Sequence, residues 1–147
     1  MATVTKKSDL GPNNNPNNHH LLLAGLKFDA KISEEARAIV SPPAAIEKAI
    51  REDAARALAA GFSYTELQID PDLAEEHLAV FEGLLQTGTY DAVMIGGGVR
   101  MNPQLTTLLE KMVNACRRIA PGAHIMFDTG PGTTTKCLER LYGVTFE

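Results

Sequence analysis

Residues 90–103 read Tyr-Asp-Ala-Val-Met-Ile-Gly-Gly-Gly-Val-Arg-Met-Asn-Pro, and they combine the two signals that decide the fold. Residues 92–95 are an uninterrupted apolar run, typical of a short strand that is buried on both faces. Three glycines follow, and Asn102–Pro103 then indicates a helix start, because asparagine caps helices and proline fits the first turn. A buried strand that leads directly into a helix is the repeating unit of a parallel α/β sheet.

The same alternation extends along the chain on both sides of this stretch. Further strands are expected at residues 20–26, 64–69 and 124–127. Helical patterns occupy residues 42–60, 72–87, 102–119 and 133–141. Strands that alternate with helices need right-handed crossovers and form a parallel sheet. We therefore expect an α/β fold, a single-domain three-layer sandwich with a short parallel sheet.

The polarity of the strands predicts their order in the sheet. Residues 21–24 and 92–95 are the most apolar, so we place them in the centre. Residues 64–69 alternate between polar and apolar, which favours an edge. The expected order, numbering the strands along the chain, is 2-1-3-4, and residues 144–146 are a candidate fragment of a fifth strand. Because open edges are usually paired or covered, we also expect a homodimer.

The first 18 residues differ in composition from the rest. They contain Gly11, Pro12, Pro16 and five asparagines, with few apolar residues. Such a segment cannot offset the entropy of its own ordering. We expect a disordered tail over residues 1–18 and one α/β domain over residues 19–147.

Charge and composition exclude several classes of protein. The net charge is −4, and no basic stripe for nucleic acid is visible. No apolar run is long enough to span a bilayer. The two cysteines, Cys116 and Cys137, fall on apolar helix faces, as expected of reduced thiols in a cytoplasmic protein. The histidines and cysteines lack zinc spacing, so we expect no metal site.

Parallel α/β sheets bind ligands beyond the carboxyl ends of their strands, where the strand order reverses. Six of the twelve glycines lie on this rim, at positions 25, 96, 97, 98, 130 and 132. Glycines allow sharp turns and close approach of a ligand to the backbone. Three in a row exceed what a turn needs, so Gly96, Gly97 and Gly98 are predicted to face a ligand. The alternative is that they only make the turn.

Charged and polar residues surround these glycines. Arg100 and Asn102 lie at the expected helix start, where a guanidinium could bind a carboxylate or a phosphate. Arg100 could equally be a solvated surface residue. Asp128, with Thr129 beside it, ends the last strand and is a candidate general base, or a carboxylate that binds only its own turn. Asp29 is the second carboxylate candidate.

The connection over residues 27–40 is longer than usual for an α/β unit. It contains Phe28 and other apolar residues between charges. We predict either a lid over the site, which makes Phe28 a candidate ligand contact, or a short surface helix used in self-association.

Known cofactor and nucleophile motifs are absent from this sequence. No glycine-lysine-serine/threonine follows a glycine-rich turn, and no G-x-G-x-x-G follows the first strand. The G-x-S-x-G nucleophile turn does not occur either. The acidic residues of response regulators and the hydroxyl-rich loop of flavodoxins are missing at the corresponding turns. We expect no cofactor.

Three turns resemble those of a known group of proteins. They are Gly25-Leu26-Lys27-Phe28-Asp29, Ile95-Gly96-Gly97-Gly98-Val99-Arg100 and Phe127-Asp128-Thr129-Gly130-Pro131. With them, residues 20–142 resemble short, largely uncharacterised bacterial and fungal single-domain α/β proteins of Rossmann-like or flavodoxin-like outline. The resemblance implies the fold and a common rim, and no particular activity. Asparagine is frequent in that group at the position of Asp128, so no base is implied there.

These features together predict a small-molecule-binding protein. We expect a cofactor-independent enzyme that acts on an anionic (carboxylate or phosphate) or carbonyl-bearing metabolite. Gly97, Gly98 and Arg100 would hold the negative group, and Asp128 or Asp29 would transfer a proton. Lyase, isomerase or hydrolase chemistry is therefore favoured over redox chemistry. The alternative is a non-catalytic binding or homo-oligomeric assembly module.

Overall fold

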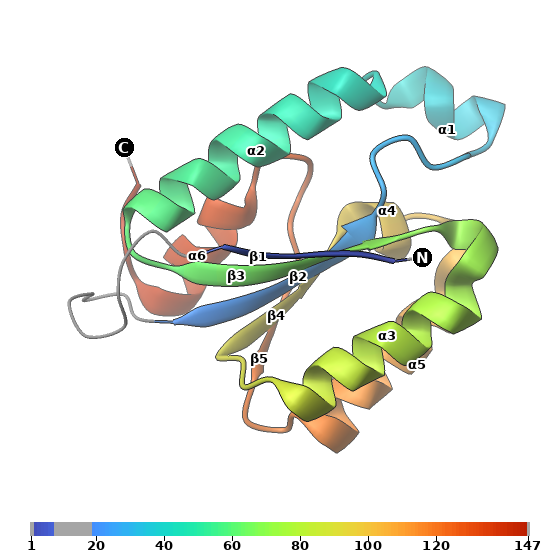
Figure 1. Ribbon diagram of the computed structural model, residues 1–147. Helices are drawn as coiled ribbons and strands as arrows, with labels where there is room; N and C mark the ends of the chain where they lie inside the picture. Colours follow the sequence, from blue (N-terminus) through green and yellow to red (C-terminus); the bar gives the residue numbers. More distant parts are fainter. Residues whose placement is uncertain (1, 8–18, 147) are drawn as a thin grey trace.

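The computed structural model describes residues 2–7 and 19–146, which form a mixed α/β fold around one five-stranded sheet (Figure 1). The strands are β1 (Thr3–Lys7), β2 (His20–Leu26), β3 (Ser63–Ile69), β4 (Ala92–Ile95) and β5 (His124–Met126). The α-helices are α1 (Glu34–Ile39), α2 (Pro43–Ala59), α3 (Ala74–Thr87), α4 (Gly97–Arg100), α5 (Thr106–Ile119) and α6 (Thr134–Tyr142). Two 3₁₀ turns, η1 (Pro71–Leu73) and η2 (Pro103–Leu105), lead into α3 and α5.

The strand order is β1-β3-β2-β4-β5. The predicted order 2-1-3-4 is wrong for this sheet, because it has four strands and the sheet has five. Strand β2 pairs in parallel with β3 and β4, and β4 pairs in parallel with β5. The difference is β1, which pairs antiparallel with β3 from Thr3 opposite Gln68 to Lys7 opposite Tyr64. The sheet is therefore mostly parallel, with one antiparallel edge strand.

The N-terminal segment supplies this unexpected strand, so the prediction of disorder is wrong for Thr3–Lys7. The rest of the predicted tail, residues 8–18, lies outside the described residues. Strand β1 also corrects the prediction that residues 64–69 form an edge, because β3 is paired on both sides. Residues 144–146 form no strand.

Helices cover both faces of the sheet, with α2 and α6 on one face and α3 and α5 on the other (Figure 1). The alternation of strand side chains builds two cores. Leu22, Val93 and Ile95 pack toward α3 and α5, whereas Leu21, Leu23 and Met94 pack toward α2 and α6. The continuous apolar runs of β2 and β4 follow from burial on both faces.

The predicted helix starts need one correction that affects the rim. Asn102 does cap a turn, since its side chain accepts a hydrogen bond from Gln104 N–H at 3.0 Å. The turn is η2, and α5 begins only at Thr106. The longest helix is α2, with 17 residues against 14 in α5. Met101 and Asn102 therefore connect two separate helical segments rather than opening one.

Candidate functional site

The glycine-rich turn after β4 folds back as the short helix α4, in which Gly96 is the N-cap. The first amide of this helix is not open to a ligand. Gly97 N–H donates a hydrogen bond to Asp128 Oδ1 at 2.9 Å. The protein's own carboxylate thus occupies the position that the sequence suggested for an external anion. Gly98 is exposed, and a Cβ on it would lie 3.2 Å from Leu26 Cβ.

Arg100 turns back toward the same carboxylate. Its Nη2 donates to the main-chain oxygen of Asp128 and to Asp128 Oδ1, the latter at 3.2 Å. The guanidinium also lies over the Phe127 ring, 5.0 Å from the centroid. The Arg100 and Asp128 side chains are only 18% and 13% exposed, so the pair is largely withdrawn from water. Arg100 Nε is buried and has no hydrogen-bond partner among the described residues.

Burial is the dominant influence on Asp128. It raises the pKa of this carboxyl above its ordinary value, although Arg100 and the Gly97 amide act in the opposite direction. Removal from water penalises the charged form more than these two partners favour it. A carboxyl group whose pKa rises toward neutrality is suited to giving and taking a proton.

Two glycines leave a part of the sheet without side chains beside this pair, where Gly25 is half-buried and Gly96 is buried. A Cβ on Gly25 would meet only Gly96 Cα, at 3.9 Å. A Cβ on Gly96 would meet backbone atoms of Gly25 and Ala24 and no side chain within 4 Å. By strand alternation both glycines face the α2 side of the sheet, as Leu23 and Met94 do. We call this part of the rim the Gly25–Gly96 strip, because neither Cβ position has a side chain within 4 Å.

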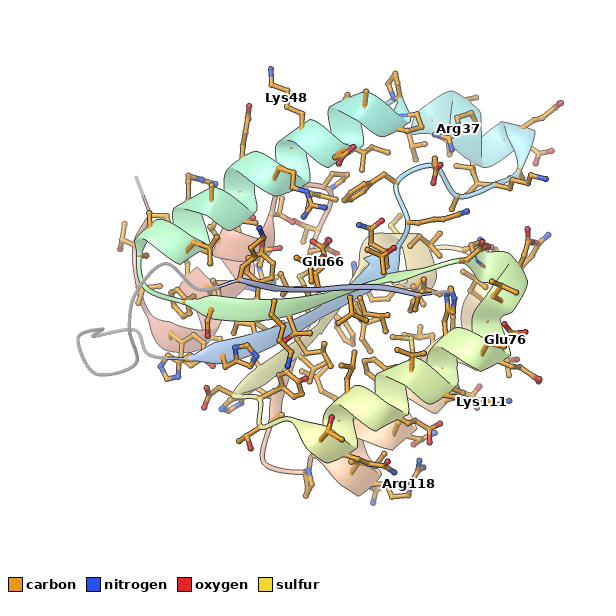
Figure 2. All side chains as sticks on the ribbon, in the orientation of Figure 1. Arg37, Lys48, Glu66, Glu76, Lys111 and Arg118 are labelled. Carbon is orange, nitrogen blue, oxygen red and sulfur yellow. The ribbon has the colours of Figure 1, made fainter. Side chains whose placement is uncertain are left out.

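A second ion pair borders the strip on the β3 side. Glu66, on the strand next to Gly25, is only 6% exposed. Its Oε2 accepts a hydrogen bond from Arg51 Nη1 of α2 at 3.0 Å, and its Oε1 accepts from Gln68 at 3.2 Å. Figure 2 shows Glu66 between the sheet and α2. The strip therefore lies between two carboxylate–arginine pairs. The carboxylate side chains are 8% and 13% exposed, and their arginines are 39% and 18% exposed.

Glu66 was not among the residues that the sequence suggested. In a strand with alternating polarity, a glutamate is normally assigned to a solvated face. The only sequence signal was the basic residue Arg51 on the helix that precedes this strand.

The other predicted residues have separate positions around the rim. Phe28 lies under Arg51, whose guanidinium carbon is 5.2 Å from the ring centroid. Asp29 is exposed in the same turn. Thr129 is also exposed, and its N–H donates to Thr133 Oγ1 at 3.0 Å within the turn before α6. Of the candidates, only Gly96, Gly97, Arg100 and Asp128 form one contiguous group.

The connection after β2 contains the short surface helix α1, and its use in self-association stays a prediction. Ser33 caps it by accepting a hydrogen bond from Ala36 N–H at 3.2 Å. Ile39, at its end, is 84% exposed. Nothing in its contacts places α1 over the strip.

The described residues show no group of three or more histidine, cysteine or acidic side chains that could hold a metal ion. Both cysteines are buried and free. Burial raises the pKa of Cys116 to about 11, which keeps this thiol protonated. In the same described ranges, no helix has the length and apolar character needed to cross a membrane.

Comparisons with known proteins add no assignment. No protein-family model matches the chain, and a search of curated proteins finds no significant match.

Proposed function

We propose that the protein is a cofactor-independent enzyme that binds a small anionic or carbonyl-bearing metabolite over the Gly25–Gly96 strip. One observation carries the proposal: the strip has no side chain over it and lies between two carboxylate–arginine pairs whose carboxylates are largely buried. Ligand sites in open α/β sheets occur at this end of the strands. Few precisely directed polar groups beside an open floor are typical of small-molecule sites.

Asp128 is the proton-transferring group in this proposal. Its raised pKa lets it take up a proton as a ligand approaches. Protonation removes the negative charge that Arg100 and Gly97 N–H now contact. The arginine can then pair with a carboxylate or phosphate of the ligand, while protonated Asp128 donates to an adjacent carbonyl oxygen. Proton chemistry of the lyase, isomerase or hydrolase type follows from these roles.

The strip itself provides the most direct test. Thermal-shift screening against carboxylates, sugar phosphates and keto acids identifies a ligand for the unchanged protein. Gly25→Leu places a side chain on the strip at a position where a Cβ meets only Gly96 Cα, so it should abolish the ligand-induced shift. The matched control is Gly83→Leu on α3, where a Cβ meets nothing within 4 Å. An undiminished shift in folded Gly25→Leu protein would refute the proposed site.

A second candidate function is that of an assembly module, and the edge strand β5 favours it. Ile125 and Phe127 are 39% and 44% exposed on this edge. They line a hollow of about 340 Å³ together with Cys137 and Arg140. An edge with exposed apolar side chains is suited to pairing with a second copy. Sedimentation of the unchanged protein should then give a dimer, and Ile125→Lys should give a monomer. A monomer at high concentration before substitution would exclude this function.

The expected location belongs to the same proposal. We place the protein in the cytoplasm, where buried free thiols such as Cys116 and Cys137 are kept reduced.

A further inference from the structure

A chain of hydroxyl and imidazole groups lies at the opposite end of the sheet, where β2 and β3 begin. His20 and Ser63 are register partners on these two strands. His20 Nδ1 lies 2.7 Å from Ser63 Oγ, and His20 Nε2 lies 3.1 Å from Thr65 Oγ1. Thr65 also hydrogen-bonds the Tyr90 hydroxyl. Both nitrogens of one imidazole are therefore held by hydroxyl groups.

The order of donors in this chain can make Ser63 reactive. In the tautomer of His20 with its hydrogen on Nε2, the ring donates to Thr65 Oγ1, and Thr65 can donate onward to Tyr90. Nδ1 then carries no hydrogen and can accept from the Ser63 hydroxyl. This is the arrangement of a nucleophile with an adjacent base that a third group orients. The orienting group here is a hydroxyl, in place of the more usual carboxylate.

The surroundings keep the imidazole neutral and fixed. Burial lowers the pKa of His20, with a smaller opposing effect from Asp91. The ring stacks on Tyr90 with centroids 5.3 Å apart and an interplanar angle of 20°. Thr65 is fully buried, while His20 and Ser63 remain partly accessible. A reagent can therefore reach Ser63, while Thr65, which orients the imidazole, is shielded from water.

Tyr90 depends on a glycine for its place in the chain. A Cβ on Gly88 would lie 2.6 Å from the Tyr90 hydroxyl oxygen. Any larger residue at this position forces the ring to move. The glycine that ends α3 thus also makes room for the last member of the hydroxyl chain.

We propose that Ser63 is a nucleophile activated by His20, and that this second site accepts acyl groups from small esters. Ser63 Oγ forms a bond to the ester carbonyl carbon while its proton passes to His20 Nδ1. The ester C–O bond then breaks, and His20 returns the proton to the departing alkoxide. The acyl group stays on Ser63 until water attacks it. His20 takes a proton from this water and gives it to Ser63 Oγ, so that a carboxylic acid leaves.

A covalent probe tests the proposal on the full-length chain. The protein is incubated with an alkyl fluorophosphonate, and intact-mass and peptide analysis follow the rate and the position of labelling. We expect one label per chain, on Ser63. Ser63→Ala should remove it. His20→Phe, which keeps a ring beside Tyr90, should slow labelling by about 100-fold, the loss typical of a missing general base. Ser41→Ala, at an exposed serine, is the matched control and should label normally.

Two results would overturn the proposal. One is labelling of folded Ser63→Ala protein at the unchanged rate. The other is an unchanged labelling rate in Thr65→Val, which removes the orienting hydroxyl. This variant tests the proposal if His20→Phe does not fold. Hydrolysis of p-nitrophenyl acetate gives a second readout. It should fall with the same variants and remain in Ser41→Ala. The ligand-induced thermal shift of the Gly25–Gly96 strip should be unchanged in Ser63→Ala, which separates this site from the one proposed at the other end of the sheet.

Discussion

Replacing Arg100 by leucine tests whether Arg100 and Asp128 form a stabilising, largely buried ion pair. The substitution removes the cation that contacts Asp128 and keeps a side chain able to pack on Phe127. Breaking a fully buried pair costs about 3–5 kcal/mol, because an uncompensated charge is left behind. Here the carboxylate is 13% exposed and keeps the Gly97 N–H hydrogen bond. We therefore expect a smaller loss, about 2–3 kcal/mol of unfolding free energy.

A double-mutant cycle isolates the pair. Asp128→Asn removes the charge that Arg100→Leu leaves unpaired, so the double variant should recover part of the loss. We expect a coupling free energy of about 1–2 kcal/mol from urea unfolding. The control is Arg118→Leu on α5, whose arginine is 61% exposed and 3.2 Å from Glu82. Figure 2 shows Arg118 on the outer surface, and its loss should change stability by about 0.5 kcal/mol or less.

The same variants have a pH signature with a definite sign. Burial already raises the pKa of Asp128, and removing Arg100 raises it further. A carboxyl with a raised folded-state pKa binds its proton more tightly when folded, so stability falls as pH rises through that pKa. The destabilisation by Arg100→Leu should be larger at pH 7 than at pH 4, and it should lose this dependence in the Asp128→Asn background. A coupling within about 0.3 kcal/mol of zero, or a loss independent of pH, would refute the pairing.

Three further predictions concern the framework of the site. Asp53→Ala should cost about 2–3 kcal/mol in urea unfolding, because buried Asp53 accepts from Thr135 N–H at 3.0 Å and from its hydroxyl; a loss below about 0.5 kcal/mol would contradict this role. Gly132→Ala should lower the melting temperature, since Gly132 has a φ of +78° and an added Cβ would lie 3.0 Å from Ala49 O; an unchanged melting temperature would contradict it. Cys116, with a pKa of about 11, should resist iodoacetamide at pH 8 until the protein is unfolded in urea, and rapid native labelling would disprove its burial.

Much of the architecture follows from the sequence because short apolar runs have few alternatives. Residues 21–24 are at most 7% exposed, and a short apolar run bounded by polar residues and glycine favours a strand covered on both faces. Strand β1 was not predicted because Thr3–Lys7 is mostly exposed. An exposed strand needs no apolar side chains, so its sequence shows no apolar pattern. Its stability comes from backbone pairing with β3, which is distant in sequence.

The sequence predicts which candidate residues lie in one region of the fold more easily than it predicts their contacts. The carboxyl ends of parallel strands meet at one rim, so Gly96 and Asp128 could be placed near each other from their positions alone. That Asp128 would take the Gly97 amide could not be predicted, because this contact depends on side-chain directions across 31 residues. Glu66 was missed for a related reason. Its burial depends on Arg51 from another element.

The pairing of β1 with β3 has a consequence for synthesis of the chain. Thr3–Lys7 precedes its partner strand Ser63–Ile69 by about sixty residues, so it waits unpaired while these residues are made. Closing so long a loop is slow, and β3 keeps an unsatisfied backbone edge until it happens. A shortened protein that begins at His19 would carry that edge permanently, so it should aggregate during expression even though its helices and remaining strands are intact.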